Sequence, residues 1–200
     1  LALMPTGGGK SLTYQIPGLA REGIVVVVTP LIALMKDQVD RLRARKIRAA
    51  AIHSGMSPRQ IDIALDNCVY GDVKFLYVAP ERLATEAFRL RVQRMQVSLL
   101  AVDEAHCISQ WGQDFRPSYL KIVEFLQRLP RRPAVAAFTA TATAQVRADI
   151  IRILQLHEPE TVVTGFDRPN LRFEVLRPKD KRTALLQLLS ERRDKSGIVY

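Results

Sequence analysis

The glycine-rich segment at residues 4–11, Met-Pro-Thr-Gly-Gly-Gly-Lys-Ser, constrains the fold of this chain more than any other stretch. It follows a short apolar run, and a loop of this kind joins a buried β-strand to a helix when it wraps around phosphate groups. Glycines let successive backbone N–H groups converge on phosphate oxygens, and the N-terminus of the following helix adds positive potential. The segment therefore predicts an α/β fold with a phosphate site at one strand end.

Each residue of this loop has an expected role in holding a nucleotide. Lys10 would place its charge on the β- and γ-phosphates, and the Ser11 hydroxyl would ligate Mg²⁺. The usual pattern has a further glycine six residues before the lysine, where this chain has Met4. The alternative is a glycine-rich turn, capped by Ser11, that binds no ligand. The backbone that would cradle the phosphates belongs to Thr6, Gly7, Gly8 and Gly9.

An acidic pair follows a second apolar run, which covers residues 99–102. A carboxylate at the end of a buried strand is where a phosphate-loop enzyme keeps its metal ligand, so we expect Asp103 to hold Mg²⁺. Glu104 lies one residue further on and would orient or deprotonate the attacking water. Together with Lys10, the two acids predict metal-assisted hydrolysis of a phosphoanhydride. The alternative is a solvated acidic turn after a core strand.

Thirty Lys and Arg residues against twenty Asp and Glu residues give the chain a formal charge of +10. Such an excess indicates a polyanionic partner, with nucleic acid as the first candidate. Charge alone does not distinguish DNA from RNA. The basic residues are spread over several segments, and each cluster by itself can equally be a solvated helix face.

Membrane and metal signals are weak in this sequence. The longest apolar stretches are far shorter than a bilayer span, and no basic-then-apolar leader opens the chain. We therefore expect a cytoplasmic protein without a membrane partner. Cys68 and Cys107 form no Cys-x-x-Cys pair and have no zinc-ligand spacing with the three histidines, so we expect reduced thiols.

Short β-branched runs alternate with segments of helical length over the first 165 residues. This alternation is typical of a mostly parallel sheet with helices on both faces, where ligands bind at the carboxyl ends of strands. The expected strands are residues 24–29, 48–52, 74–78, 98–103, 133–139 and 161–164, and the expected helices are residues 31–44, 58–69, 117–129 and 143–154.

The pattern changes near residues 165–170, Gly-Phe-Asp-Arg-Pro-Asn. A strand at residues 171–176, a helix at 179–193 and a strand at 197–200 are expected to follow. We interpret residues 1–165 as one domain, and residues 166–200 as a hinge and the start of a second α/β domain. Both ends of the chain look like truncations inside larger domains.

Taken together, these motifs resemble those of the RecQ-type DNA helicases of helicase superfamily 2, over nearly the whole chain. The most specific segment is residues 107–119, Cys-Ile-Ser-Gln-Trp-Gly-Gln-Asp-Phe-Arg-Pro-Ser-Tyr, which is similar to the aromatic-rich loop that distinguishes RecQ proteins from other helicases. Methionine at position 4 is usual in that family. Further segments resemble helicase motif I (4–11), motif Ia (29–39), the block that follows it (79–83), the DEAH form of motif II (103–106), motif III (138–142) and the Phe-Asp-Arg-Pro-Asn block (165–170).

The resemblance implies a RecA-like P-loop NTPase fold, with ATP and Mg²⁺ as cofactors. His106 would bridge the nucleotide site toward motif III or the aromatic loop, and Thr139 and Thr141 would relay the nucleotide state between domains. The family's arginine finger would come from the second motor domain in cis, downstream of this chain. The implied activity is ATP-driven translocation on single-stranded DNA and unwinding of partially duplex DNA, with 3′-to-5′ polarity, in the cytoplasm or, in a eukaryote, the nucleus.

The aromatic segment also allows a functional interpretation from its residue types alone. Aromatic faces stack on unpaired bases without demanding a sequence, and an arginine between them can contact a phosphate or a ring. Trp111, Phe115 and Arg116 are therefore candidate nucleic-acid or coupling residues. Alternatively, Trp111, Phe115 and Tyr119 form one apolar helix face in a core, although Gly112 and Pro117 would interrupt that helix.

Two other functions stay open at this point. An RNA-directed DEAD or DEAH motor shares motifs I and II, but lacks the aromatic segment found here. A nucleotide-dependent binding module without catalytic activity would also fit a truncated motor domain.

Overall fold

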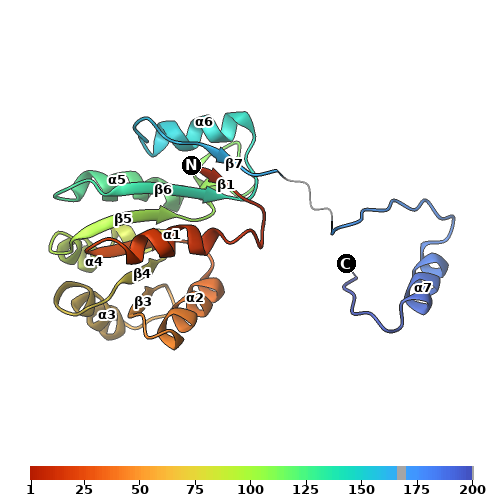
Figure 1. The fold of residues 1–200 in the computed structure, drawn as a ribbon, viewed down its shortest axis with the longest axis horizontal. Helices are drawn as coiled ribbons and strands as arrows, with labels where there is room; N and C mark the ends of the chain where they lie inside the picture. The colour runs from red at the N-terminus through yellow and green to blue at the C-terminus, as the bar shows by residue number, and fades with distance from the viewer. Residues whose placement is uncertain (166–169, 200) are drawn as a thin grey trace. The chain divides into compact units, whose positions relative to one another are not determined.

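The computed structural model describes residues 1–165 and 170–199, and the chain divides into two compact units, Leu1–Phe166 and Asp167–Tyr200 (Figure 1). Residues 166–169, which make up most of the expected hinge block, lie outside the described residues. Along the described parts of the chain, no helix is both long and apolar enough to span a membrane.

The first unit is built on a seven-stranded sheet in which every pair of neighbouring strands is parallel. The strand order is β3-β4-β2-β5-β6-β1-β7. All six expected strands form, each within two residues of its expected bounds, and the RecA-like α/β class is confirmed. The strands are β1 (Ala2–Leu3), β2 (Ile24–Val28), β3 (Ala49–Ile52), β4 (Phe75–Val78), β5 (Val97–Val102), β6 (Ala134–Thr139) and β7 (Val162–Val163).

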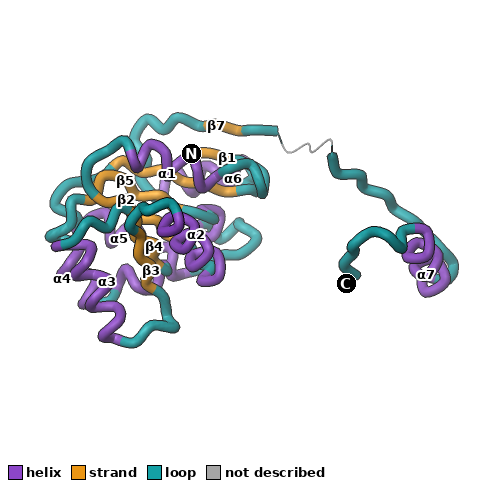
Figure 2. Tube along the Cα trace, turned by 60° about the horizontal axis from the view of Figure 1, so that its bottom comes forward, coloured by secondary structure: helices purple, strands orange, loops and turns teal. Residues whose placement is uncertain are grey.

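Helices cover both faces of this sheet, as Figures 1 and 2 show. The helices are α1 (Lys10–Leu19), α2 (Ile32–Ala44), α3 (Pro58–Tyr70), α4 (Glu86–Val92), α5 (Lys121–Arg128) and α6 (Ala144–Ile153). Three short 3₁₀ helices lie between them: η1 (Pro80–Ala84), η2 (Ala105–Ile108) and η3 (Pro117–Leu120). The expected helix at 117–129 is therefore η3 followed by α5, and α4 was not anticipated.

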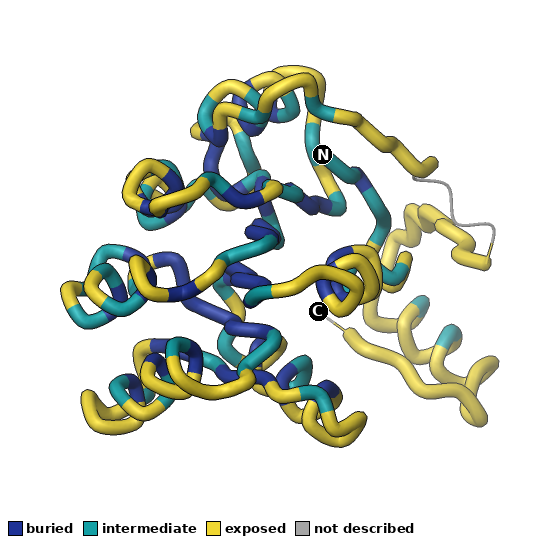
Figure 3. Tube along the Cα trace, turned by 60° about the vertical axis from the view of Figure 1, so that its left-hand side comes forward, coloured by how far each residue is buried: buried dark blue, intermediate teal, exposed yellow. Residues whose placement is uncertain are grey.

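The central strand β2 explains the two-layer core. Its valines alternate in direction, so Val26 and Val28 pack with helices α3 to α6, while Val25 and Val27 pack with α1 and α2. All four are inaccessible to solvent, and Figure 3 shows that buried segments run through the interior of this unit. A strand buried on both faces requires a continuous apolar run, which is what residues 24–28 provide.

The open edge of the sheet at β3 is protected by a side chain from α2. Arg43 donates a hydrogen bond from Nε to the carbonyl oxygen of Ala49, at 3.0 Å. The neighbouring carbonyls of Arg48 and Ile52 face inward, because they accept from residues of β4 and the segments beside it. An outward carbonyl of the edge strand is thus already bonded within the chain.

Within residues 170–199 the second unit has one helix, α7 (Lys181–Glu191). Its N-cap is Asp180, whose carboxylate accepts from the Arg182 N–H at 2.9 Å. This confirms the helix expected at 179–193. The strands expected at 171–176 and 197–200 are wrong over the residues described, because neither segment forms a strand there. An extended segment becomes a strand only when a neighbour accepts its backbone hydrogen bonds.

Helix α1 lies unusually close to the sheet because it has a glycine at its contact point. A Cβ atom on Gly18 would lie 2.7 Å from Cγ2 of Val25 and 3.2 Å from Cε1 of Phe75. Both neighbours are fully buried strand residues that cannot swing aside. The close packing fixes the helix that carries Lys10 at its first turn.

Replacing Gly18 with valine should therefore lower the free energy of unfolding by at least about 1–3 kcal/mol, the usual cost of overpacking a filled core. Chemical denaturation of the 200-residue chain measures this. Gly165→Ala is the matched control, because a Cβ atom there meets no atom within 4 Å. Equal stability of Gly18→Val and the parent would mean that α1 does not rest on the sheet at this point.

Candidate nucleotide site and aromatic loop

The candidate site lies where four neighbouring strands end at one edge of the sheet. The strands β2, β5, β6 and β1 are adjacent and parallel, so the segments that follow them emerge side by side. Two backbone hydrogen bonds tie these segments together: Met4 N–H donates to the Thr139 carbonyl at 3.0 Å, and Asp103 N–H donates to the Val28 carbonyl at 2.9 Å. The glycine-rich loop, the acidic pair and motif III therefore meet at this edge.

The glycine-rich loop has the backbone that an anion requires. Gly7 and Gly9 both have φ of +81°, in the left-handed region, and a Cβ atom on either would point into open space. Gly8 N–H donates to the Pro5 carbonyl at 3.0 Å, which closes the turn. Helix α1 begins at Lys10 with Gly9 as its N-cap, and no side chain among the described residues caps it. Its first N–H groups are thus available to phosphate oxygens.

Asp103 is half-buried among groups that both oppose and favour its charge. Its Oδ1 accepts from the Glu104 N–H at 3.0 Å, and its Oδ2 lies 3.5 Å from the Thr29 hydroxyl. Burial, and next the Glu104 carboxylate, raise the pKa of Asp103, while the Glu104 N–H, the Lys10 charge and the Thr29 hydroxyl counteract them. A carboxylate whose charge is disfavoured in this way is typical of a functional site.

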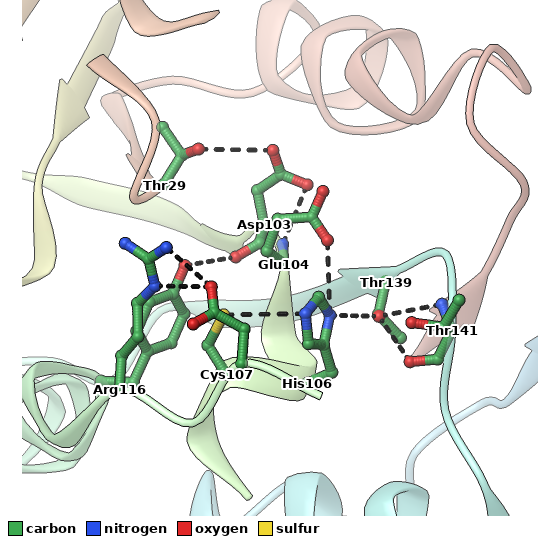
Figure 4. Close-up of polar contacts among 10 residues, drawn as sticks. Thr29, Asp103, Glu104, His106, Cys107, Arg116, Thr139 and Thr141 are labelled. Atoms are coloured by element: carbon green, nitrogen blue, oxygen red, sulfur yellow. Dashed lines mark hydrogen bonds and ion pairs between the residues drawn. The ribbon is translucent and has the colours of Figure 1, made fainter. Parts of the chain in front are cut away.

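Glu104 sits in a backbone conformation that non-glycine residues rarely adopt, with φ 48° and ψ 44°. This left-handed residue turns the chain sharply from β5 into η2. Its Oε2 lies 3.4 Å from Nδ1 of His106. The turn therefore separates the two acids, with Asp103 near Thr29 and Glu104 near His106 (Figure 4).

His106 is connected to motif III through the Thr139 hydroxyl (Figure 4). The fully buried Thr139 donates its hydroxyl proton to the Thr141 carbonyl at 3.1 Å, and accepts from the Thr141 N–H at 3.3 Å. The Thr139 hydroxyl lies 2.9 Å from Nδ1 of His106, and with its proton on the Thr141 carbonyl it accepts from that nitrogen in the Nδ1–H tautomer. His106 Nε2 is then free to accept from the Cys107 thiol, 3.8 Å away.

The aromatic residues of the loop at 107–119 have three different environments. Trp111 is 73% exposed, Phe115 is half-buried, and Tyr119 is fully buried with its hydroxyl donating to the Asp103 carbonyl at 2.9 Å. The alternative of one aromatic helix face is therefore wrong, because turns and η3 divide the segment. Arg116 forms a 2.6 Å ion pair with Asp114.

Several site contacts came from residues that the sequence did not single out. Thr29 and Tyr119 both contact Asp103. The only sequence signals for these contacts are that Thr29 directly follows a strand and that Tyr119 lies in the aromatic segment. His53 follows β3 directly, and its pKa is lowered by burial and then by the charges of Lys36 and Arg82. Arg82 Nε is buried without a hydrogen-bond partner among the described residues.

Residues 1–150 match the family model described as DEAD/DEAH box helicase. The ATP-dependent DNA helicase RecQ of Bacillus subtilis is 46% identical over 99% of this chain, and that of Pasteurella multocida is 42% identical over 100%. The chain spans 34% and 32% of those two proteins, or about a third of their length.

Solved structures share the fold at low sequence identity. The Hef helicase domain of Pyrococcus furiosus aligns with a TM-score of 0.63 at 20% identity, covering 84% of this chain and 36% of that one. The Mycobacterium smegmatis helicase Lhr, solved with ssDNA and AMP-PNP, aligns with a TM-score of 0.63 at 21% identity, covering 82% and 23%.

The raised pKa of Asp103 has a testable effect on stability. A carboxyl group whose pKa is higher in the folded than in the unfolded state makes stability fall as pH rises between the two values. At pH 7 the Asp103 anion thus destabilises the chain, and Asp103→Asn, whose amide can serve both Thr29 and the Glu104 N–H, should raise the melting temperature in the absence of nucleotide and metal. The gain should shrink as the pH falls toward about 4, the ordinary carboxyl pKa.

Calorimetry between pH 4 and pH 7.5 measures this difference. Asp40→Asn, which changes an exposed carboxylate on α2, is the matched control and should leave the melting temperature unaltered. A lower melting temperature for Asp103→Asn at pH 7 would mean that Lys10 and Thr29 overcompensate the burial.

Proposed function

Because this chain belongs to the DEAD/DEAH box helicase family, we propose that it is the ATP-binding motor domain of an ATP-dependent DNA helicase of the RecQ type. One observation carries the proposal: the acidic motif at the nucleotide edge continues directly into a loop that exposes Trp111. A motor needs a physical connection of this kind between hydrolysis and the polymer on which it moves. The domain comprises residues 1–165, and residues 166–200 are a hinge and the start of a second motor domain.

The residues at the strand ends fit ATP and Mg²⁺ as ligands. The backbone of residues 6–9 would cradle the phosphates, with the N-terminus of α1 pointing at them and Lys10 adding its charge. Ser11 and Asp103 provide the hydroxyl and carboxylate oxygens that Mg²⁺ prefers. Bound Mg²⁺ would neutralise charge that develops on the β- and γ-phosphates.

We assign the activation of the attacking water to Glu104. Its strained backbone directs the carboxylate away from Asp103 and toward His106. Glu104 can therefore accept a proton from water while Asp103 remains bound to Mg²⁺. The His106–Thr139–Thr141 chain then carries changes at Glu104 to motif III. Full turnover requires a positive charge beside the leaving phosphates. We assign this charge to an arginine of the second motor domain in cis, which contributes a factor of roughly 10³–10⁵ to the rate.

Single-stranded DNA would run across the strand ends on the side of the aromatic loop. Trp111 and Phe115 offer ring faces to unpaired bases. Arg116 can reach a phosphate once its partly exposed pair with Asp114 opens, and such pairs are worth at most about 1 kcal/mol. Lys36, His53 and Arg82 form a second basic group, in which the buried Arg82 Nε lacks a partner among the described residues.

The proposal extends to partially duplex DNA as the unwinding substrate and to 3′-to-5′ movement, which rests on the resemblance to RecQ helicases alone. A protein of this activity works where the DNA is: in the cytoplasm of a bacterium or the nucleus of a eukaryote.

The alternatives, an RNA motor and a non-catalytic binding module, are separated by one experiment. ATP hydrolysis is measured with single-stranded DNA, with RNA of the same base order and with no polymer, on this chain and on a version extended by the second motor domain. Stimulation by DNA well above that by RNA supports the proposal. Equal stimulation favours the RNA motor, and no hydrolysis in the extended protein favours the binding module.

Two substitutions separate the roles at the nucleotide edge. Lys10→Ala should weaken ATP binding about 10- to 100-fold, the value of a charge-assisted hydrogen bond. Glu104→Gln should bind ATP normally and slow single-turnover hydrolysis by about 10²–10⁴, the contribution of a general base. Titration of a fluorescent ATP analogue and rapid-quench kinetics measure the two effects. Lys121→Ala, on the surface of α5, is the charge control, and weak ATP binding by Glu104→Gln would show that the two acids have exchanged roles.

Removing the exposed ring of the loop should affect DNA and leave the fold intact. Trp111→Ala should weaken single-stranded DNA binding by about one to two orders of magnitude, because stacking contributes about 1–3 kcal/mol per base. Its melting temperature should barely change, since Trp111 is 73% exposed. Tyr70→Ala on α3 removes an aromatic residue of the same exposure and is the control. A large fall in melting temperature with unchanged DNA affinity would make Trp111 a packing residue.

A further inference from the structure

The start of the aromatic loop is anchored by a buried serine. Ser109 is the residue that ends η2 and is inaccessible to solvent. Its hydroxyl accepts from the Trp111 N–H at 3.2 Å and donates to Oδ2 of Asp149 at 2.7 Å. The Ser109 hydroxyl thus connects the backbone at Trp111 to Asp149, which lies forty positions after Ser109.

Asp149 lies on α6 and is itself nearly buried, with 7% exposure. Its Oδ1 pairs with the exposed Arg152 at 2.8 Å, which leaves Oδ2 for Ser109. The hydrogen bonds from Arg152 and then Ser109 lower the pKa of Asp149, so the carboxylate stays charged and accepting at neutral pH. A carboxylate within an otherwise apolar helix face is kept there by these two partners.

The turn between Ser109 and Trp111 leaves little freedom to compensate for loss of this anchor. Gly112 N–H donates to the Ser109 carbonyl at 3.0 Å, and a Cβ atom on Gly112 would lie 2.3 Å from the His106 carbonyl oxygen. At the far end, Arg116 N–H donates to the Cys107 carbonyl at 2.9 Å. The loop is closed at both ends on η2, while its tip, Trp111, is exposed.

We infer that Asp149 is a positioning residue for the aromatic loop: acting through Ser109, it fixes the backbone at Trp111 and so sets how the indole is presented to single-stranded DNA. The role toward DNA rests on the proposed function, whereas the hold on Trp111 does not. The N-cap of α6 is Thr143, two residues after Thr141, so the helix that holds the loop also follows motif III directly. Movement of motif III can therefore reach Trp111 through Asp149 without passing through His106.

The chain contains a single tryptophan, so fluorescence reports this loop directly. We expect Ser109→Ala and Asp149→Ala to increase the nanosecond mobility of Trp111 in time-resolved anisotropy. Both should also raise the oligo(dT) concentration for half-maximal quenching by about threefold to tenfold, as loss of one buried hydrogen bond implies. The double variant should be no worse than either single variant, because both remove the same connection.

Two further variants distinguish positioning from general destabilisation. Asp149→Asn keeps an oxygen acceptor for Ser109 and should restore both anisotropy and DNA affinity, although it lacks the charge. Arg152→Ala removes the other partner of Asp149 and should leave Trp111 mobility unaltered. If Ser109→Ala is poorly folded, the comparison of Asp149→Ala with Asp149→Asn at equal melting temperature decides the point.

The outcomes for the two proposals are separable. Suppose that the wild-type chain does not bind oligo(dT), while Trp111 is more mobile in Asp149→Ala than in the wild type. This result would refute the proposed function and support the positioning role. Wild-type chain that binds oligo(dT), with anisotropy and affinity unchanged in both single variants, would overturn the positioning role. Equal loss in Asp149→Asn and Asp149→Ala would also overturn it, because the effect would then follow charge rather than the hydrogen bond to Ser109.

Discussion

The parallel alignment of β2 with β5 is the constraint on which the candidate site depends. In this register Val28 lies beside Val102, so both strands end at the same level, and the next N–H, that of Asp103, donates to the Val28 carbonyl. The last bond of the ladder thereby belongs to Asp103, the residue whose carboxylate we propose as the metal ligand. The packing of the sheet keeps Asp103 in place, because the valines of β2 are fully buried on both faces.

At this edge of the sheet, two residues adopt states that lower the stability of the fold but fix the positions of their carboxylates. Glu104 adopts a left-handed backbone, and Asp103 holds a charge that its surroundings disfavour. Both are adjacent to well-packed elements, β5 on one side and η2 on the other. Local strain of this kind persists only where surrounding structure overdetermines it, and it is concentrated at functional sites.

Much of the fold could be predicted from the sequence because its signals are local. The valine run at 24–28 and the glycine-rich loop each specify their own structure through burial and backbone freedom, whatever lies nearby. The strand expected at 171–176 was wrong because strand formation needs a neighbour, which no property of those residues reveals. The helix at 181–191 formed as expected, since helical hydrogen bonds are made within the segment.

The site shows the same division. The phosphate loop and the acidic pair could be predicted from their spacing, and the resemblance linked His106 to motif III. The contacts of Tyr119 with Asp103 and of Ser109 with Asp149 could not, because each joins residues whose meeting depends on how helices pack. A serine hydroxyl or a buried tyrosine has no sequence pattern that names its partner.

The bond from Arg43 to the edge strand β3 has a consequence for how this protein behaves at high concentration. If copies of this chain bind along one nucleic-acid strand, as the proposed function implies, their unpaired β-edges come close together. The guanidinium on the Ala49 carbonyl occupies one of the outward acceptors that such a junction would need, and it brings a positive charge that repels the same edge of another copy. On the proposed function, this positive charge at the β3 edge would also keep neighbouring copies apart on one nucleic-acid strand.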